Sequence, residues 1–132
     1  KDKELVGSFK RKLKNRSLNK PIFVKHANAL DMESIFEDSF IDKIITDPPW
    51  GFYEDIDMDI DVFYKRMLQE FHRILKPNGI IILLTARKSE FESSLANYEN
   101  EFELCNKYDI LVSGKKASIY KVIKKQNTKA LG

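Results

Sequence analysis

The amino-acid sequence predicts an α/β fold with a mostly parallel sheet, and three segments carry this prediction. Residues 80–84, Ile-Ile-Ile-Leu-Leu, form an apolar run without alternation, which is typical of a strand covered on both faces. A second strand is expected at residues 42–46, and apolar side chains at helical spacing lie between the two. This succession of strand, helix and strand favours a parallel pair of strands joined by a crossover helix.

Length and composition favour a single globular domain. A chain of 132 residues with 42% apolar and 11% aromatic residues is large enough for a hydrophobic core. We assign residues 1–125 to this domain and residues 126–132 to a frayed tail. The longest apolar run is too short for a bilayer and no signal peptide is recognisable, so we expect a cytoplasmic protein without membrane contact. The single cysteine, Cys105, is expected to be a small core residue.

The N-terminal part is expected to contain a basic helix and a short strand. Residues 4–16 combine apolar side chains at helical spacing with a basic remaining face, which predicts an amphipathic helix. Residues 22–24, Ile-Phe-Val, predict a buried strand, and the polar segment 26–32 follows it. Open α/β sheets bind ligands at the carboxyl ends of their strands, which makes this segment a candidate binding loop.

The second half of the chain predicts two helices and three strands. A stripe of apolar residues indicates a helix over residues 62–76, with His72 on its exposed face; the stripe comprises Phe63, Met67, Leu68, Phe71, Ile74 and Leu75. The sequence Lys76-Pro77-Asn78-Gly79 is expected to end this helix with a turn before the strand 80–84. Beyond it we expect a helix over residues 88–100, then strands over 109–113 and 118–123 that pair across a turn at 114–117.

The segment Asp47-Pro48-Pro49-Trp50, followed by Gly51, has the residue types that a reaction on an amine requires. The strand 42–46 delivers a carboxylate to its end, and two prolines fix the loop and remove two backbone donors. The loop carbonyls then remain acceptors, the indole offers a flat stacking face, and the glycine permits close approach of a ligand. These features suit a nucleobase NH2 group, whereas the simpler alternative is a proline-rich turn after a core strand.

Two charge patterns bear on partners. Residues 1–25 hold nine Lys or Arg against two acids, and residues 113–132 hold six Lys and no acid, a distribution that suits a phosphate backbone. Ordinary solvated surface is the alternative explanation. Acidic residues alternate with apolar ones over residues 55–61, but this segment lacks the glycine and the terminal glutamate of a calcium-binding loop. We therefore predict no metal site, and we expect a flexible acidic loop that ends with Asp61 as a helix cap.

With these motifs the chain resembles the S-adenosylmethionine-dependent methyltransferases that modify exocyclic amines and carry the motif Asp/Asn-Pro-Pro-Tyr/Trp/Phe. A strand ending in Asp47-Pro48-Pro49-Trp50, a helix ending at residues 73–79 and the strand 80–85 are similar to the second half of a class I methyltransferase domain. Within that group, Leu83-Leu84-Thr85 and residues 114–120 most resemble the RNA guanine-N2 methyltransferases that carry THUMP domains.

The resemblance implies a partial Rossmann-like sheet. In the family the strand order is 3-2-1-4-5-7-6, with the last strands antiparallel, and the chain lacks the first two strands and their glycine-rich cofactor loop. No Gly-x-Gly occurs in the sequence. We therefore expect an N-terminal half or a second chain to complete the sheet. Asp47 would belong both to the cofactor-binding residues, with Asn28 and Ala29, and to the catalytic residues, with Pro48, Pro49 and Trp50.

By the same resemblance the cofactor is S-adenosylmethionine and Trp50, Gly51 and Phe52 bind the substrate. The implied reaction is methylation of guanine N2 or adenine N6 in RNA, with tRNA or rRNA as the partner. Two alternatives remain: a DNA adenine-N6 methyltransferase, which uses the same tetrapeptide, and a catalytically silent nucleic-acid-binding remnant, which the basic ends and the missing cofactor loop would also fit.

Overall fold

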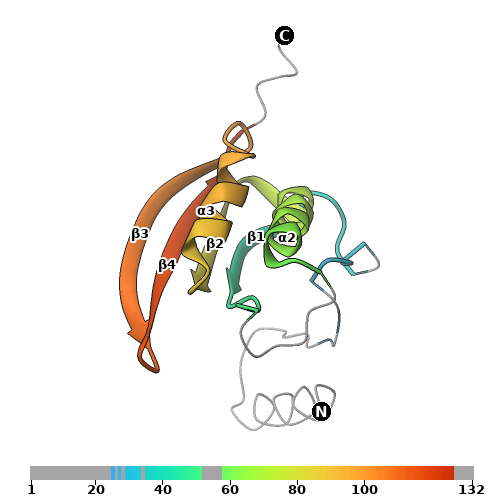
Figure 1. The fold of residues 1–132 in the computed structure, drawn as a ribbon. Helices are drawn as coiled ribbons and strands as arrows, with labels where there is room; N and C mark the ends of the chain where they lie inside the picture. Colours follow the sequence, from blue (N-terminus) through green and yellow to red (C-terminus); the bar gives the residue numbers. More distant parts are fainter. Residues whose placement is uncertain (1–24, 26, 28, 34, 52–57, 127–132) are drawn as a thin grey trace, which may run out of the picture.

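The computed structural model describes residues 25, 27, 29–33, 35–51 and 58–126 (Figure 1). The predicted helix 4–16, the predicted strand 22–24 and the predicted tail lie largely or wholly outside these residues. The elements in chain order are β1 (Ile41–Thr46), α2 (Ile60–Ile74), β2 (Leu75–Thr85), α3 (Lys88–Ala96), β3 (Phe102–Val112) and β4 (Lys115–Lys124). No helix among them has the length and apolarity that a membrane span requires.

The described strands form one mixed sheet in the order β1-β2-β4-β3. β1 pairs with β2 in parallel across the crossover helix α2, whereas β4 pairs antiparallel with both β2 and β3. This is the predicted arrangement of a parallel part followed by a closing antiparallel pair. It corresponds to the 4-5-7-6 half of the strand order that the sequence led us to expect.

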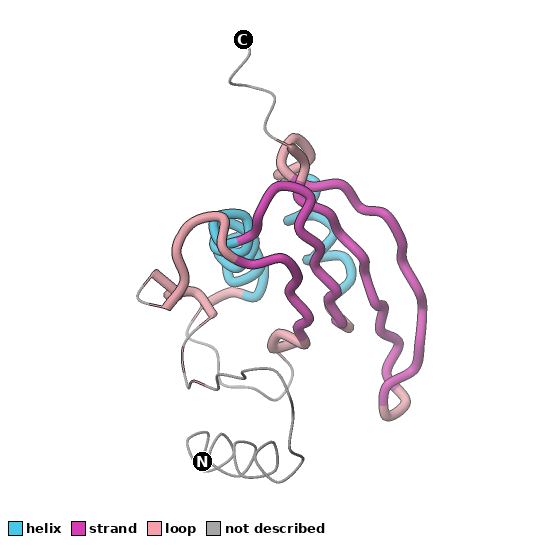
Figure 2. The backbone as a smooth tube through the Cα atoms, turned by 180° about the vertical axis from the view of Figure 1, so that it is seen from behind, coloured by secondary structure: helices cyan, strands magenta, loops and turns pink. Residues whose placement is uncertain are grey.

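Both helices lie on the same face of the sheet, since the strands stand in front of them when the molecule is seen from behind (Figure 2). Side chains on that face form the core, and Ile81 and Leu83 of β2 are fully buried in it. The expectation that β2 is covered on both faces is therefore wrong for the described residues, because Ile80, Ile82 and Leu84 are only half-buried.

Helix α2 begins two residues earlier than predicted. Its N-cap is Asp59, whose side chain makes no capping hydrogen bond, and Asp61 lies inside the first turn. The prediction of Asp61 as the cap is thus wrong, although its carboxylate still lies near the positive end of the helix dipole. The buried stripe starts at Tyr64 rather than Phe63, and it comprises Tyr64, Met67, Leu68, Phe71 and Ile74. Because the Tyr64 side chain is buried, its hydroxyl can form hydrogen bonds with groups inside the protein.

The predicted turn at residues 76–79 is instead part of strand β2. Ile41 is paired with Leu75 and Lys43 with Ile80, so the extra residues of β2 form an irregularity opposite Asp42. The left-handed conformation falls on Asn78, with a φ of 68°, and not on Gly79. Gly79 is needed for another reason: a Cβ there would lie 2.8 Å from the Leu75 side chain and 2.8 Å from the Lys76 carbonyl oxygen.

We expect Gly79→Ala to lower the free energy of unfolding by about 2–3 kcal/mol, because the added methyl group forces β2 away from its own backbone. Urea denaturation measures this loss. Gly114→Ala is the matched control: its Cβ meets nothing within 4 Å, although its φ is +81°. Left-handed strain alone should cost the control about 1 kcal/mol. Equal losses in the two variants would show that the close contact at Gly79 contributes nothing.

The C-terminal hairpin is longer than predicted and its turn is shorter. Ser113 and Gly114, with φ angles of 49° and 81°, form a two-residue turn between β3 and β4. Positive φ at both positions matches the twist of antiparallel strands, which explains why this turn replaces the four-residue turn expected. Cys105 lies where the β3 register shifts and is only half-buried, so its prediction as a core residue is wrong. Helix α3 ends at Ala96, four residues before the predicted end.

The C-terminal end of α2 is closed by a buried lysine. Lys124 of β4 donates hydrogen bonds of 2.8 Å to the carbonyl oxygens of His72 and Leu75. A cation at this end satisfies free carbonyls and the negative end of the helix dipole. His72 was expected to be exposed, but its ring packs edge-on against Phe102 with 5.5 Å between ring centroids. Burial lowers the pKa of His72, and the ring contact with Phe102 gives this side chain a packing role.

Candidate active site

The predicted motif forms the loop that leaves β1 at the carboxyl edge of the sheet. Because β1 and β2 are parallel, this edge also carries the end of β2 and the start of α3. The loop contains Asp47, Pro48, Pro49, Trp50 and Gly51, all of which are described. Of the other predicted site residues, Asn28 and Phe52 lie outside the described residues, and Ala29 is an exposed turn residue.

The carboxylate of Asp47 is held by the indole of Trp50. The Trp50 Nε1 donates a hydrogen bond of 3.1 Å to Asp47 Oδ1. This bond engages one carboxylate oxygen and leaves Oδ2 without a hydrogen bond from the described residues. Trp50 therefore orients the carboxylate with its polar edge, a contact that the sequence did not predict. Asp47 itself is exposed, so the second oxygen can receive a donor from a ligand.

The backbone carbonyls of the motif are not equivalent. The Pro49 oxygen accepts a hydrogen bond of 3.1 Å from the Tyr64 hydroxyl. The Trp50 oxygen accepts one of 2.6 Å from Arg87 Nε. No described residue donates to the Pro48 oxygen. Of three successive carbonyls, two are thus engaged by the protein, whereas the first, that of the buried Pro48, receives no hydrogen bond from a described residue.

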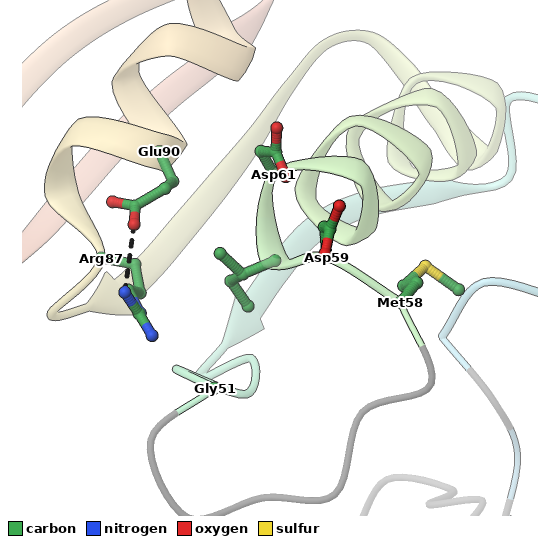
Figure 3. A pocket seen from close by; sticks show the side chains of 7 residues that line it. Gly51, Met58, Asp59, Asp61, Arg87 and Glu90 are labelled. Carbon is green, nitrogen blue, oxygen red and sulfur yellow. Dashed lines mark hydrogen bonds and ion pairs between the residues drawn. The ribbon is translucent and has the colours of Figure 1, made fainter.

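A hollow of about 450 Å³ opens beside this loop (Figure 3). Gly51 forms one side with a φ of 77°, a left-handed conformation that favours glycine. Next to Gly51, Arg87 Nη1 and Glu90 Oε2 form an ion pair at 3.2 Å, and Arg87 Nη2 would lie 3.6 Å from a Cβ at Gly51. The lining holds three carboxylates and one guanidinium and comprises Gly51, Met58, Asp59, Ile60, Asp61, Arg87 and Glu90. Its three carboxylates disfavour a bound phosphate and favour groups that donate hydrogen bonds.

Three residues of this site, Tyr64, Thr85 and Arg87, were not predicted from the sequence as site residues. Thr85 is the last residue of β2 and Arg87 lies two residues beyond it. A polar residue at the end of an apolar strand is the signal that identified Asp47, and that signal was available in the sequence. Tyr64 gave no signal, because its position is that of one more aromatic residue in an apolar helix stripe. Burial raises the pKa of Tyr64 to about 12, so its hydroxyl stays protonated at neutral pH and can donate.

The fold is shared with solved methyltransferases. TrmN from Thermus thermophilus matches 77% of this chain and 28% of its own length, at 24% identity and a TM-score of 0.62. TTHA0409, also from Thermus thermophilus, is a proposed DNA modification methylase complexed with S-adenosyl-L-methionine. It matches 76% of this chain and 52% of its own, at 14% identity and a TM-score of 0.56.

The N-methyltransferase NodS from Bradyrhizobium japonicum WM9, in complex with S-adenosyl-L-homocysteine, matches 76% of this chain and 53% of its own length, at 10% identity and a TM-score of 0.55. These likenesses confirm the predicted fold class, a partial class I methyltransferase of Rossmann-like type. The chain spans between about a quarter and about half of the length of these three proteins.

No curated protein matches the chain. A family model does, and its description is the RMKL-like methyltransferase domain. It matches residues 1–114, which include the loop 47–51 and the strands β1 and β2. The chain therefore belongs to the family of RMKL-like methyltransferase domains.

Proposed function

We propose that the chain takes part in methyl transfer from S-adenosylmethionine to the exocyclic amine of a nucleobase, guanine N2 or adenine N6 in RNA. The observation that carries this proposal is the pair of acceptors at the end of β1, Asp47 Oδ2 and the Pro48 carbonyl oxygen. An NH2 group has two N–H donors, and two adjacent acceptors can hold both. The resemblance of the motif to amine methyltransferases supports the same assignment, with tRNA or rRNA as the substrate.

The bound cofactor supplies a methyl group on a sulfonium, so the protein mainly has to hold a weak nitrogen nucleophile in line with it. As the new N–C bond forms and the S–C bond breaks, positive charge develops on the nitrogen. The Asp47 carboxylate and the Pro48 carbonyl stabilise that charge through the N–H groups they accept. The methylated amine then releases one proton to the solvent next to the exposed Asp47 side chain. The base remains stacked on the indole of Trp50 during the reaction.

The acidic hollow supports a base rather than a phosphate at this point of the surface. Asp59, Asp61 and Glu90 line it beside the loop, and the Arg87 guanidinium is paired with Glu90. Phosphates would have to bind elsewhere, and the basic segments 1–25 and 113–132 are the proposed contacts. A base reaches such a hollow at low cost from single-stranded or looped RNA, because no pairing has to be broken.

A DNA adenine-N6 methyltransferase is the second candidate, since the fold is shared with a proposed DNA modification methylase. Transfer of labelled methyl groups to RNA and to DNA, followed by nucleoside analysis, separates the candidates. Label in N2-methylguanosine or N6-methyladenosine from RNA supports the proposal. Label in DNA alone favours the second candidate, and nucleic-acid binding without any label indicates a catalytically silent protein.

We expect this 132-residue chain alone to bind S-adenosylmethionine weakly, with a dissociation constant well above the micromolar range. The reason is that its sequence contains no Gly-x-Gly, the loop type whose backbone lies close to such cofactors. Isothermal titration calorimetry with the purified chain measures this. Micromolar or tighter binding would contradict the expectation and would require another set of residues to hold the cofactor.

A further inference from the structure

A directed chain of hydrogen bonds connects the end of β2 to the motif loop. The Arg87 backbone N–H donates to Thr85 Oγ1 at 2.9 Å, and Thr85 Oγ1 lies 2.6 Å from the Tyr64 hydroxyl oxygen. Tyr64 has one hydroxyl hydrogen, and the bond to the Pro49 carbonyl uses it. Thr85 must therefore be the donor in its bond with Tyr64. The four groups then form a sequence in which each one donates to the next.

The interior of the protein makes this chain of bonds strong and hard to rearrange. Tyr64 and Thr85 are both fully buried, so water cannot replace the hydrogen bond between them without opening the core. Ring contacts hold the phenol in place, with Phe91 packed edge-on against it at 5.9 Å between centroids. Arg87 adds a second connection through its side chain, whose Nε donates to the Trp50 carbonyl. Pro49 is thus held by Tyr64 of α2, and Trp50 is held by Arg87, the residue before α3.

We infer that Tyr64, Thr85 and Arg87 are positioning residues: they hold the Pro49 and Trp50 carbonyls toward the protein, so that the Pro48 carbonyl and Asp47 remain for the target amine. This inference rests on the function proposed above. None of the three residues needs to touch the substrate. Their contribution is to the geometry of the loop, and a displacement of about 1 Å in such a loop can cost a hundredfold in rate.

Fluorescence of Trp50 tests the positioning without any activity, because Trp50 is the only tryptophan of the chain. In Tyr64→Phe and Thr85→Val we expect acrylamide quenching of Trp50 to rise about twofold, since a loop released from its hydrogen bonds exposes the indole. Thr85→Ser should restore the parent value. Tyr98→Phe is the matched control, because the Tyr98 hydroxyl also donates to a backbone carbonyl of α2, that of Lys65, but not to the loop.

Arg87→Lys covers the case in which the core variants do not fold. Its side chain is partly exposed, so the change spares the core, and lysine keeps the charge but has no Nε in the guanidinium geometry. It should also raise the quenching. The inference is overturned if Arg87→Lys and every folded core variant leave the quenching of Trp50 at the value of Tyr98→Phe.

Enzyme kinetics provide a second test of the positioning role, in a preparation of the protein that transfers methyl groups. Tyr64→Phe should lower kcat about ten- to a hundredfold and leave the dissociation constant of S-adenosylmethionine within about twofold, because only the geometry at the amine changes. Equal loss in kcat and cofactor affinity would overturn the positioning role. If the parent transfers no methyl group while quenching still responds, the proposed function fails and the positioning of the loop stands.

Discussion

Asp47→Ala is expected to lower the rate of methyl transfer by about a hundredfold or more, because the carboxylate stabilises charge that develops on the amine only in the transition state. The affinity for S-adenosylmethionine should stay within a few-fold. Single-turnover experiments measure the rate of methyl transfer, and calorimetry measures the affinity for S-adenosylmethionine. Both use a preparation in which the parent protein transfers methyl groups. The structure sharpens this expectation, since Trp50 fixes the carboxylate and one oxygen is left for a ligand.

Asp42→Ala is the matched control for this experiment. Asp42 is an exposed aspartate of β1, the strand that precedes the loop, and its carboxylate pairs with Lys76 at 3.2 Å on the protein surface. Asp42→Ala should leave the rate of methyl transfer unchanged, since exposed ion pairs contribute little to the stability of a fold. Unchanged turnover in Asp47→Ala would remove the mechanism proposed above. Equal losses of rate and cofactor affinity would place Asp47 in the cofactor site instead.

Reversing three basic residues of the segment 4–16, Lys10, Lys12 and Lys14, to glutamate is expected to weaken RNA binding by several kcal/mol, about 1–2 per site, if they contact phosphates. The slope of log affinity against log salt should become flatter by roughly two to three units, at about 0.7 to 0.9 for each phosphate that is no longer neutralised. Binding isotherms at several salt concentrations measure both. This segment lies outside the described residues, so the expectation rests on the sequence.

Neutralising Asp55 and Asp57 is the opposite control, because both belong to the acidic segment 55–61 of the sequence. Removing negative charge there should strengthen nonspecific binding slightly or leave it unchanged. A reversed protein whose salt slope equals that of the parent would refute phosphate contacts by this segment. The motif loop and the basic segment 113–132 would then be the features that still argue for a nucleic-acid substrate.

The sequence by itself determined the order of elements from β1 onward and the position of the candidate site. Apolar runs and helical spacing are local patterns, and they placed β1, α2 and the core of β2 within a few residues of their observed bounds. The two prolines also act locally, because each fixes its own φ and removes its own donor. For these reasons the loop 47–51 could be identified before any contact across the fold was known.

The tertiary structure alone decided what surrounds that loop. Tyr64 meets Pro49 and Thr85 across 15 and 21 residues of sequence, and Arg87 reaches Trp50 across 37. Gly79 is required because the Leu75 side chain and the carbonyl oxygens of Lys76 and Asp42 approach it, not because of its own conformation. Likewise the second face of β2 is apolar in sequence, yet no described helix packs on it. Such contacts depend on how far elements separated in sequence approach one another, and local propensity carries no information about that distance.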